Sequence, residues 1–194
     1  MRGLKIAAET VAEHVARQER NVFEAAVRLF VERGYEQVTF GDIADEVGLA
    51  RNSLYRYYPS KAAILARWIE SELDEAVTRS ASILGAEGPP AERIMSWADD
   101  QVAYARRPEH ALLVAFSSAR AELGPESLRR LGEAHGRLNE PLIATLREAG
   151  ADSPDLAAGL IFGLVDQASA WPADRDEELR PLLRNGIDAL VPRS

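Results

Sequence analysis

Residues 39–61 have the sequence TFGDIADEVGLARNSLYRYYPSK, and this stretch decides the fold. Apolar residues recur at helical spacing on both sides of Gly48, which predicts two short helices. Thr39 can cap the first helix, and Gly48 can end it after about two turns. The second helix begins near Arg51 and must end before Pro59, because proline cannot continue a helix. Two short helices around a tight turn predict a helix-turn-helix module.

Longer helices are predicted on both sides of this module. A helix from about Arg17 to Arg33 precedes it, and residues 6–16 either prolong that helix or form a loose arm. A helix capped by Ser60 follows and runs to about Leu84. Sustained strand alternation is lacking, so the expected fold class is all-α. Glycine and proline separate the other predicted helices, which are residues 91–106, 109–121, 124–148 with a kink at Pro141, 155–171 and 177–191.

The composition limits the classes of function that the chain can have. The 194 residues carry a net charge of -8, but residues 1–61 are neutral, and the stretch between Glu46 and Glu70 holds basic residues without acidic ones. The absence of cysteine excludes disulfides, thiolate nucleophiles and Cys-type zinc sites. Apolar runs are too short to cross a bilayer, and Met1 to Thr10 lack a secretory h-region, so we expect a cytoplasmic protein without membrane contact.

Signatures of catalysis are not found. His14, His110 and His135 lack metal-ligand spacing, and the sequence contains no nucleophile elbow, P-loop or dinucleotide fingerprint. We therefore expect no catalytic residue, metal or cofactor, and an all-α enzyme is the least favoured class.

The last two predicted helices favour a subunit interface. Residues 155–171 are apolar nearly all round, and such a helix needs two partners. Gly159 and Gly163 permit close approach of another helix. The alternative is an internal core helix of a monomer, and we predict a homodimer. The residues expected to face the chain's own core are Leu156, Leu160 and Leu164. The last helix carries an apolar stripe that supports the interface, and this stripe is Leu179, Leu183, Ile187 and Val191.

The helix-turn-helix segment resembles the DNA-binding signature of the tetracycline-repressor (TetR) family of bacterial regulators. The resemblance spans Phe23 to Leu65 and includes Leu29-Phe30-Xaa-Xaa-Xaa-Gly34-Tyr35 and Leu54-Tyr55-Xaa-Tyr57-Tyr58-Xaa-Xaa-Lys61. It implies a homodimeric repressor that a small-molecule effector releases from operator DNA. We assign residues 1–60 to a helix-turn-helix DNA-binding domain with an N-terminal arm, and residues 61–194 to a helical effector-binding and dimerisation domain. Two departures are Ala50, where the family usually has a Ser or Thr cap, and the longer arm.

The residues expected to touch DNA lie in and around the second short helix. Arg51 and Asn52 occupy its first turn, where Arg can pair with guanine and Asn with adenine, so they are the candidates for reading bases. Hydroxyl groups, cations and the N-termini of helices bind phosphates. The candidates for phosphate contact are Thr39, Ser53, Tyr55, Arg56, Tyr57 and Lys61.

The candidate effector residues lie in the C-terminal part, and each can equally be plain core. Tyr104, His110 and His135 are possible polar anchors in an apolar cavity. Asp166 lies in an apolar stretch, where a carboxylate needs a cationic partner or a place at the rim. The full set is Trp97, Tyr104, His110, Phe116, His135, Phe162 and Asp166.

One alternative function remains open beside that of a DNA-binding regulator. A protein-interaction module or co-regulator that has lost DNA binding would explain the acidic C-terminal part and the missing cap at Ala50. An activator would make the same DNA contacts as a repressor. The sequence does not name the operator, the effector or the regulated genes.

Overall fold

The computed structural model describes the backbone of residues 2–192 and the side chains of residues 11–113, 115, 116 and 119–192. Over these residues every regular element is helical, which confirms the predicted all-α class. The chain forms two compact units: residues 1–69 with 111–128, and residues 70–110 with 129–194. Within residues 2–192, no helix has both the length and the apolar character that crossing a bilayer requires.

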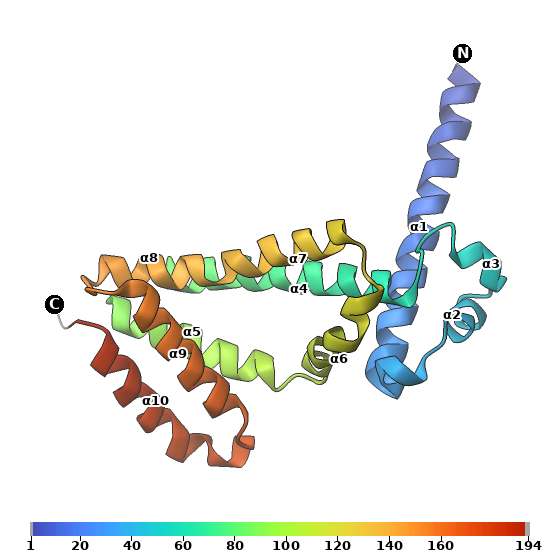
Figure 1. The fold of residues 1–194 in the computed structure, drawn as a ribbon. Coiled ribbons are helices and arrows are strands. Elements are labelled where there is room, and N and C mark those ends of the chain that lie inside the picture. Colours follow the sequence, from blue (N-terminus) through green and yellow to red (C-terminus); the bar gives the residue numbers. More distant parts are fainter. Residues whose placement is uncertain (1, 193–194) are drawn as a thin grey trace. The chain divides into compact units, whose positions relative to one another are not determined.

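The first unit contains the helix-turn-helix. Its core is formed by the buried side chains of α1, α2, α3 and the start of α4, among them Leu29, Ile43 and Leu54. Helix α6 also belongs to this unit and packs against α1 and the short turn η1. The elements are α1 (Arg2–Arg33), η1 (Tyr35–Gln37), α2 (Phe40–Glu46), α3 (Arg51–Leu54), the start of α4 (Lys61–Leu84), α6 (Ala111–Ala119) and η3 (Arg120–Glu122) (Figure 1).

Helix α1 is one continuous helix of 32 residues, so residues 6–16 prolong the predicted helix. Its C-terminal half is packed, with Val22 and Ala26 fully buried, whereas the side chains of residues 11–17 are exposed. Val11 keeps 63% of its surface exposed. Arg2 and Lys5 lie in the arm, and their side chains fall outside the described part of the chain.

The second unit is a bundle in which α9 packs against α5, α8 and α10. Its core includes Trp97, Leu142, Ile161 and Ile187. The predicted apolar stripe of the last helix exists, but Leu183, Ile187 and Val191 are buried in the core of the same chain, so they do not face a partner subunit as the sequence led us to expect. The elements are α5 (Pro90–Ala105), η2 (Pro108–His110), α7 (Pro125–Gly136), η4 (Arg137–Asn139), α8 (Glu140–Glu148), α9 (Pro154–Ser169), η5 (Ala173–Arg175) and α10 (Asp176–Leu190) (Figure 1).

The predicted helix 124–148 is divided in two. Helix α7 ends at Gly136, a single 3-10 turn follows over Arg137–Asn139, and α8 starts one residue before Pro141. Proline lacks the N–H group that would bond to the carbonyl four residues earlier, and its ring clashes with that carbonyl. The predicted kink at Pro141 is therefore a break in the helix.

The predicted orientation of α9 is wrong. Leu156 and Leu160 keep 72% and 59% of their surface exposed, and only Leu164 of the three predicted core leucines is partly buried. Helix α9 instead turns small and β-branched residues inward, because it packs closely on three other helices. Its buried side chains are Ala157, Ala158, Ile161, Val165 and Ala168.

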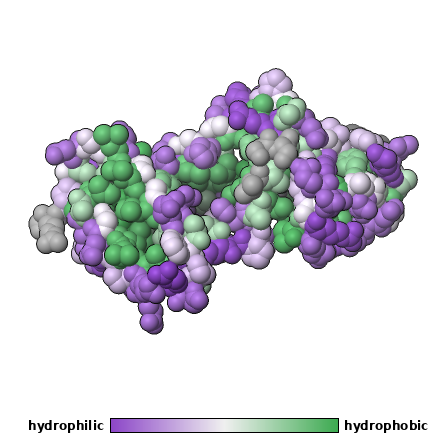
Figure 2. Space-filling model, turned by 60° about the horizontal axis from the view of Figure 1, so that its bottom comes forward, coloured by the Kyte–Doolittle hydropathy of each residue, from purple (hydrophilic) through white to green (hydrophobic). Residues whose placement is uncertain are grey.

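An apolar face over α9 and α10 has no partner among the residues that the structure describes. Leu156 and Leu160 on α9 and Leu182 on α10 are large apolar side chains that remain exposed. Figure 2 shows the apolar surface on this end of the second unit. A helix face of this kind marks a site of association.

Candidate nucleic-acid interface

Helix α2 starts at a complete capping box, as the sequence predicts. The Thr39 hydroxyl accepts from the Asp42 N–H at 3.2 Å. The Asp42 carboxylate in turn accepts from the Thr39 N–H at 2.7 Å and from the Thr39 hydroxyl at 2.6 Å. These bonds from Thr39 hold the pKa of the Asp42 carboxyl below its ordinary value. This contribution to stability is present at neutral pH and is lost as the pH falls through the lowered pKa.

Replacing Thr39 with alanine is expected to lower the free energy of unfolding by about 1 kcal/mol, because the first N–H groups of α2 lose their acceptor. Urea unfolding followed by circular dichroism measures the change. Thr78→Ala is the matched control, since the exposed Thr78 hydroxyl only donates to the Asp74 carbonyl within α4. Equal losses from the two variants would contradict the capping role of Thr39.

The turn and the second helix follow from the backbone of the segment. Gly48 adopts a φ of 68°, which L side chains rarely adopt, and the Leu49 N–H donates to the Ala44 carbonyl at 2.9 Å. Helix α3 then begins at Arg51 with Ala50 as its N-cap, and the Ala50 side chain makes no capping bond. Backbone bonds from Tyr57 and Tyr58 to the Leu54 carbonyl continue as turns beyond the helix.

One face of α3 is buried, and the other is open. Leu54 is fully buried, whereas Arg51 and Asn52 are exposed. Arg56, in the turn after the helix, is exposed as well. Among the residues that the structure describes, neither Arg51 nor Arg56 has an ion-pair partner. The open face therefore presents unpaired cations on a segment without acidic residues.

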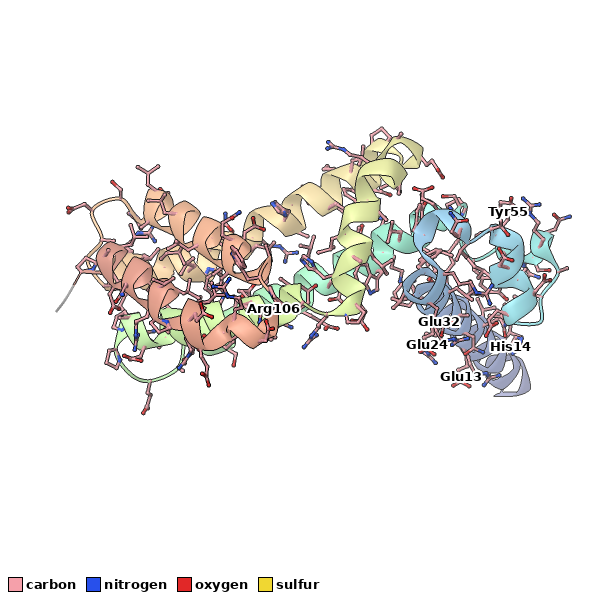
Figure 3. The ribbon with its side chains drawn as sticks, turned by 90° about the horizontal axis from the view of Figure 1, so that it is seen from below. Glu13, His14, Glu24, Glu32, Tyr55 and Arg106 are labelled. Atoms are coloured by element: carbon pink, nitrogen blue, oxygen red, sulfur yellow. The ribbon has the colours of Figure 1, made fainter. Side chains whose placement is uncertain are left out.

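The hydroxyl-bearing candidates beside α3 differ in exposure. Ser53 and Tyr57 are partly buried, and Tyr55 is exposed. The Tyr55 ring packs on the Phe40 ring of α2, with the ring centroids 4.9 Å apart. Figure 3 labels Tyr55 at the outer edge of this helix-turn-helix.

The other two predicted phosphate ligands are engaged inside the unit. Both the hydroxyl hydrogen and the N–H of Thr39 are donated to Asp42. The Lys61 ammonium is held by the backbone of the turn between α1 and α2. Helix α4, which begins at Lys61, is capped as predicted, because the Ala63 N–H donates to the Ser60 hydroxyl at 3.2 Å.

Residues 22–67 match the family described as "Bacterial regulatory proteins, tetR family". The uncharacterized HTH-type transcriptional regulator YfiR of Bacillus subtilis is 33% identical over 67 residues, which cover 34% of this chain and 33% of YfiR. The HTH-type transcriptional repressor KstR2 of Mycobacterium tuberculosis is 31% identical over 86 residues, which cover 44% of this chain and 43% of KstR2. The chain thus spans only about a third to under a half of these relatives' length.

One solved structure extends the likeness to the whole fold. A transcriptional regulator from Saccharomonospora viridis, in complex with choline, superposes with a TM-score of 0.71 at 22% identity, over 92% of this chain and all of that chain. The buried core, the capped α2 and the open α3 define a helix-turn-helix protein. Residues 22–67 thus carry a domain that matches the DNA-binding domain of the TetR family of bacterial regulators.

The predicted effector residues are brought together only in part. Trp97 is buried, its indole N–H donates to the Ser80 hydroxyl at 3.0 Å, and its ring meets the Phe162 ring edge-on at a centroid distance of 5.0 Å. His135 and Asp166 are exposed on α7 and α9. Phe116, on α6, belongs to the first unit.

Tyr104 and His110 form a second pair in the same unit. Their rings meet edge-on with centroids 5.7 Å apart, and the Tyr104 hydroxyl donates to the Glu72 carboxylate at 2.7 Å. Burial and this bond to Glu72 raise the pKa of the Tyr104 hydroxyl. The guanidinium of Arg79 lies 4.9 Å from the centre of the Tyr104 ring.

Two open grooves of the second unit are lined by other residues. A groove of about 260 Å³ between α5 and α10 holds Arg106, which forms two 2.8 Å bonds to Asp176 and is labelled in Figure 3. The Arg106 guanidinium holds the pKa of the Asp176 carboxyl below its ordinary value. A groove between α4 and α7 is flanked by the ion pairs Arg130–Glu70 and Arg137–Asp74. Sequence periodicity could not locate either groove, because these ion pairs join residues that lie 60 to 70 positions apart.

Proposed function

We propose that the chain is a homodimeric transcriptional repressor that binds operator DNA through α3 and is released by a small-molecule effector. The observation that carries the proposal is the open face of α3, where Arg51 and Asn52 are exposed in a stretch of sequence without acidic residues. The match to the TetR family and the likeness to the repressor KstR2 support it.

The side chains at this face have different tasks. In the first turn of a helix lying in the major groove, Arg51 pairs with guanine and Asn52 with adenine. Ser53, Tyr55, Arg56 and Tyr57 bind phosphates and fix the register of the helix on the duplex. Thr39 supports these DNA-contacting side chains from inside the unit, because its hydroxyl donates a hydrogen bond to Asp42.

We assign DNA recognition to residues 1–60, and effector binding with dimerisation to residues 61–194. The segment 111–128 belongs to the first compact unit, where α6 packs against α1 and η1.

The dimer forms through α9 and α10, as a four-helix interface. Leu156, Leu160 and Leu182 supply its exposed apolar groups. Gly159 and Gly163 lie on the same helix as the two former leucines, and a Cβ atom added at either meets nothing within 4 Å. Among the described residues no contact requires these two positions to be small, and their openness is compatible with the close approach of a partner helix.

The effector binds in the second unit, with the paired rings of Tyr104 and His110 as its polar anchors. Binding of choline by the S. viridis regulator supports a small-molecule site in a unit of this fold. The effector shifts α4, which begins directly after Pro59 and Ser60. A shift of α4 changes the spacing of the two recognition helices, which must match one turn of DNA, about 34 to 36 Å.

Genomic capture tests the proposal. The purified full-length chain is mixed with sheared DNA from its own source, and the retained fragments are sequenced. Enrichment of a few fragments that share a two-fold symmetric motif is expected. Retention of fragments without any shared motif, or of none, would contradict the proposal.

A further inference from the structure

Three ion pairs join α5 to α10 within the second unit, and we call them the charge ladder. Each pairs an arginine guanidinium with a carboxylate, at distances of 2.6, 2.7 and 2.8 Å. The pairs follow one another in opposite order along the two helices, which therefore run antiparallel (Figure 1). The pairs are Glu92–Arg184, Asp99–Arg180 and Arg106–Asp176.

The polarity of the charge ladder changes along its length. The carboxylate belongs to α5 in the first two pairs, whereas in the third Arg106 at the end of α5 binds Asp176 on α10. Helix dipoles favour a cation at the end of α5 and an acid at the start of α10, so this third pair has a second cause. The middle pair, Asp99–Arg180, lies beyond the terminal turns of both helices, where the dipole has little effect.

Apolar packing does not select one position of α10 along α5. The apolar stripe of α10 recurs every four residues, so a slide by one turn replaces each apolar side chain with another. A Cβ atom added at Gly186 would lie 2.7 Å from the end of the Leu164 side chain on α9, but that end can rotate to another rotamer. The stripe consists of Leu179, Leu183, Ile187 and Val191.

The charges do distinguish neighbouring positions of α10. A slide by one turn that moves Arg180 toward Glu92 also moves Asp176 toward Asp99, which places two carboxylates together. The opposite slide moves Asp188 toward Glu92 and also places two arginines together. Opposite charges meet at all three sites only in the register that the structure shows.

Exposed ion pairs of this kind each change an equilibrium constant by a factor of up to about five. Such a factor matters little to the whole fold, but it decides between registers that share the same apolar packing. We infer that the charge ladder fixes the register of α10 on α5 and so aligns the face through which two subunits associate. Leu182 on α10 must line up with Leu156 and Leu160 on α9 to form that face. The inference rests on the proposed dimer and names the residues that position its interface.

Distances between two spin labels test the inference, because the chain has no cysteine of its own. Labels are attached to Ala103→Cys on α5 and Asn185→Cys on α10, both at exposed positions, and pulsed electron spin resonance measures their separation. Asn185 follows Arg184, the partner of Glu92 near the start of α5, so the line between the labels runs along α5. Dilution with unlabelled chains restricts the measurement to distances within one chain, and a single distance is expected.

The two single charge reversals should move α10 in opposite directions. In Arg180→Glu, a slide by one turn lets the new carboxylate approach Arg106, so a second distance about 5 Å shorter is expected. In Asp99→Arg, the opposite slide lets Arg180 approach Glu92 while Asp176 meets the new guanidinium, so a longer second distance is expected. The double variant Asp99→Arg/Arg180→Glu pairs opposite charges again and should return the single starting distance.

Two control variants should keep the starting distance. Arg147→Glu reverses an exposed cation on α8, outside the charge ladder, and Arg180→Gln removes an attraction without adding a like charge. Unchanged distances in both single reversals, changes in the same direction, or a double variant that does not return would overturn the inference. If one single reversal does not fold, the other reversal and the double variant decide by the same comparison.

Sedimentation of the same variants connects the register to dimerisation. If half of the chains adopt the shifted register, half of the subunits are competent to associate, and the dissociation constant should rise about fourfold. The double variant should restore it. A monomeric unmodified chain would defeat the proposed dimer, and the label distances alone would still decide whether the charge ladder sets the register. A dimeric chain whose label distances ignore both reversals would defeat only the charge ladder.

Discussion

Replacing Gly159 and Gly163 together with leucine is expected to convert the proposed dimer into monomers. Both glycines are exposed within α9, and a Cβ atom added at either meets nothing within 4 Å in the same chain. Leucine is also the better helix former, so the fold of the monomer should not suffer. In the dimer, larger side chains would force the partner helices apart.

Two substitutions in each subunit place four leucines in the interface. At about 1 kcal/mol of overpacking for each, the dissociation constant should rise roughly a thousandfold. Sedimentation over a range of concentrations measures it. Gly132→Leu on α7 is the control, since that glycine also has open space around its Cβ position and lies outside α9 and α10. A double variant that dimerises as tightly as the unmodified chain would contradict the assigned interface.

Replacing Trp97 with alanine is expected to lower the free energy of unfolding by about 3 to 5 kcal/mol. Trp97 has 1% of its surface exposed, packs edge-on against Phe162, and donates to a buried hydroxyl of Ser80. Alanine leaves a cavity in the core of the second unit and an unpaired hydroxyl.

Denaturant unfolding of Trp97→Ala and Trp97→Phe measures the two losses. Trp97→Phe removes the N–H donor and only part of the indole volume, so its loss of about 1 to 3 kcal/mol should be smaller than that of Trp97→Ala. A loss below about 1 kcal/mol for Trp97→Ala would show that this part of the bundle is not packed around the indole.

Local sequence patterns were sufficient to predict the structure of the helix-turn-helix. The cap at Thr39, the turn at Gly48, the stop before Pro59 and the buried Leu54 all depend on residues within one or two helical turns of each other. Such interactions are visible in the sequence, because spacing alone determines them. The all-α class follows from the same kind of evidence.

Contacts between distant residues could not be derived in this way. The Tyr35 and Val38 carbonyls that accept from Lys61 carry no side-chain signal, so the sequence could not predict these two bonds. In α9, apolar residues occur on every side, and periodicity could not tell that alanines face the core while Leu156 and Leu160 face outward. The close packing of α9 against three helices selected the small residues.

The order of residues along the chain could not predict which of the candidate effector residues fold together. Phe116 was grouped with Trp97 and Phe162 because all are aromatic and follow residue 61, but α6 folds with the first unit. Sequence order does not reveal that a helix returns to an earlier part of the chain.

The proposed reading of bases by Arg51 on α3 is tested most directly by one titration. The unmodified chain, Arg51→Ala and the control Arg147→Ala, which removes an exposed cation from α8, are titrated with a captured genomic fragment and with random duplex at one salt concentration. Arg51→Ala is expected to weaken binding to the captured fragment by about 1 to 3 kcal/mol per half-site and to change random binding little, while Arg147→Ala changes neither. Equal weakening on both duplexes, or none, would contradict the assignment of base reading to Arg51.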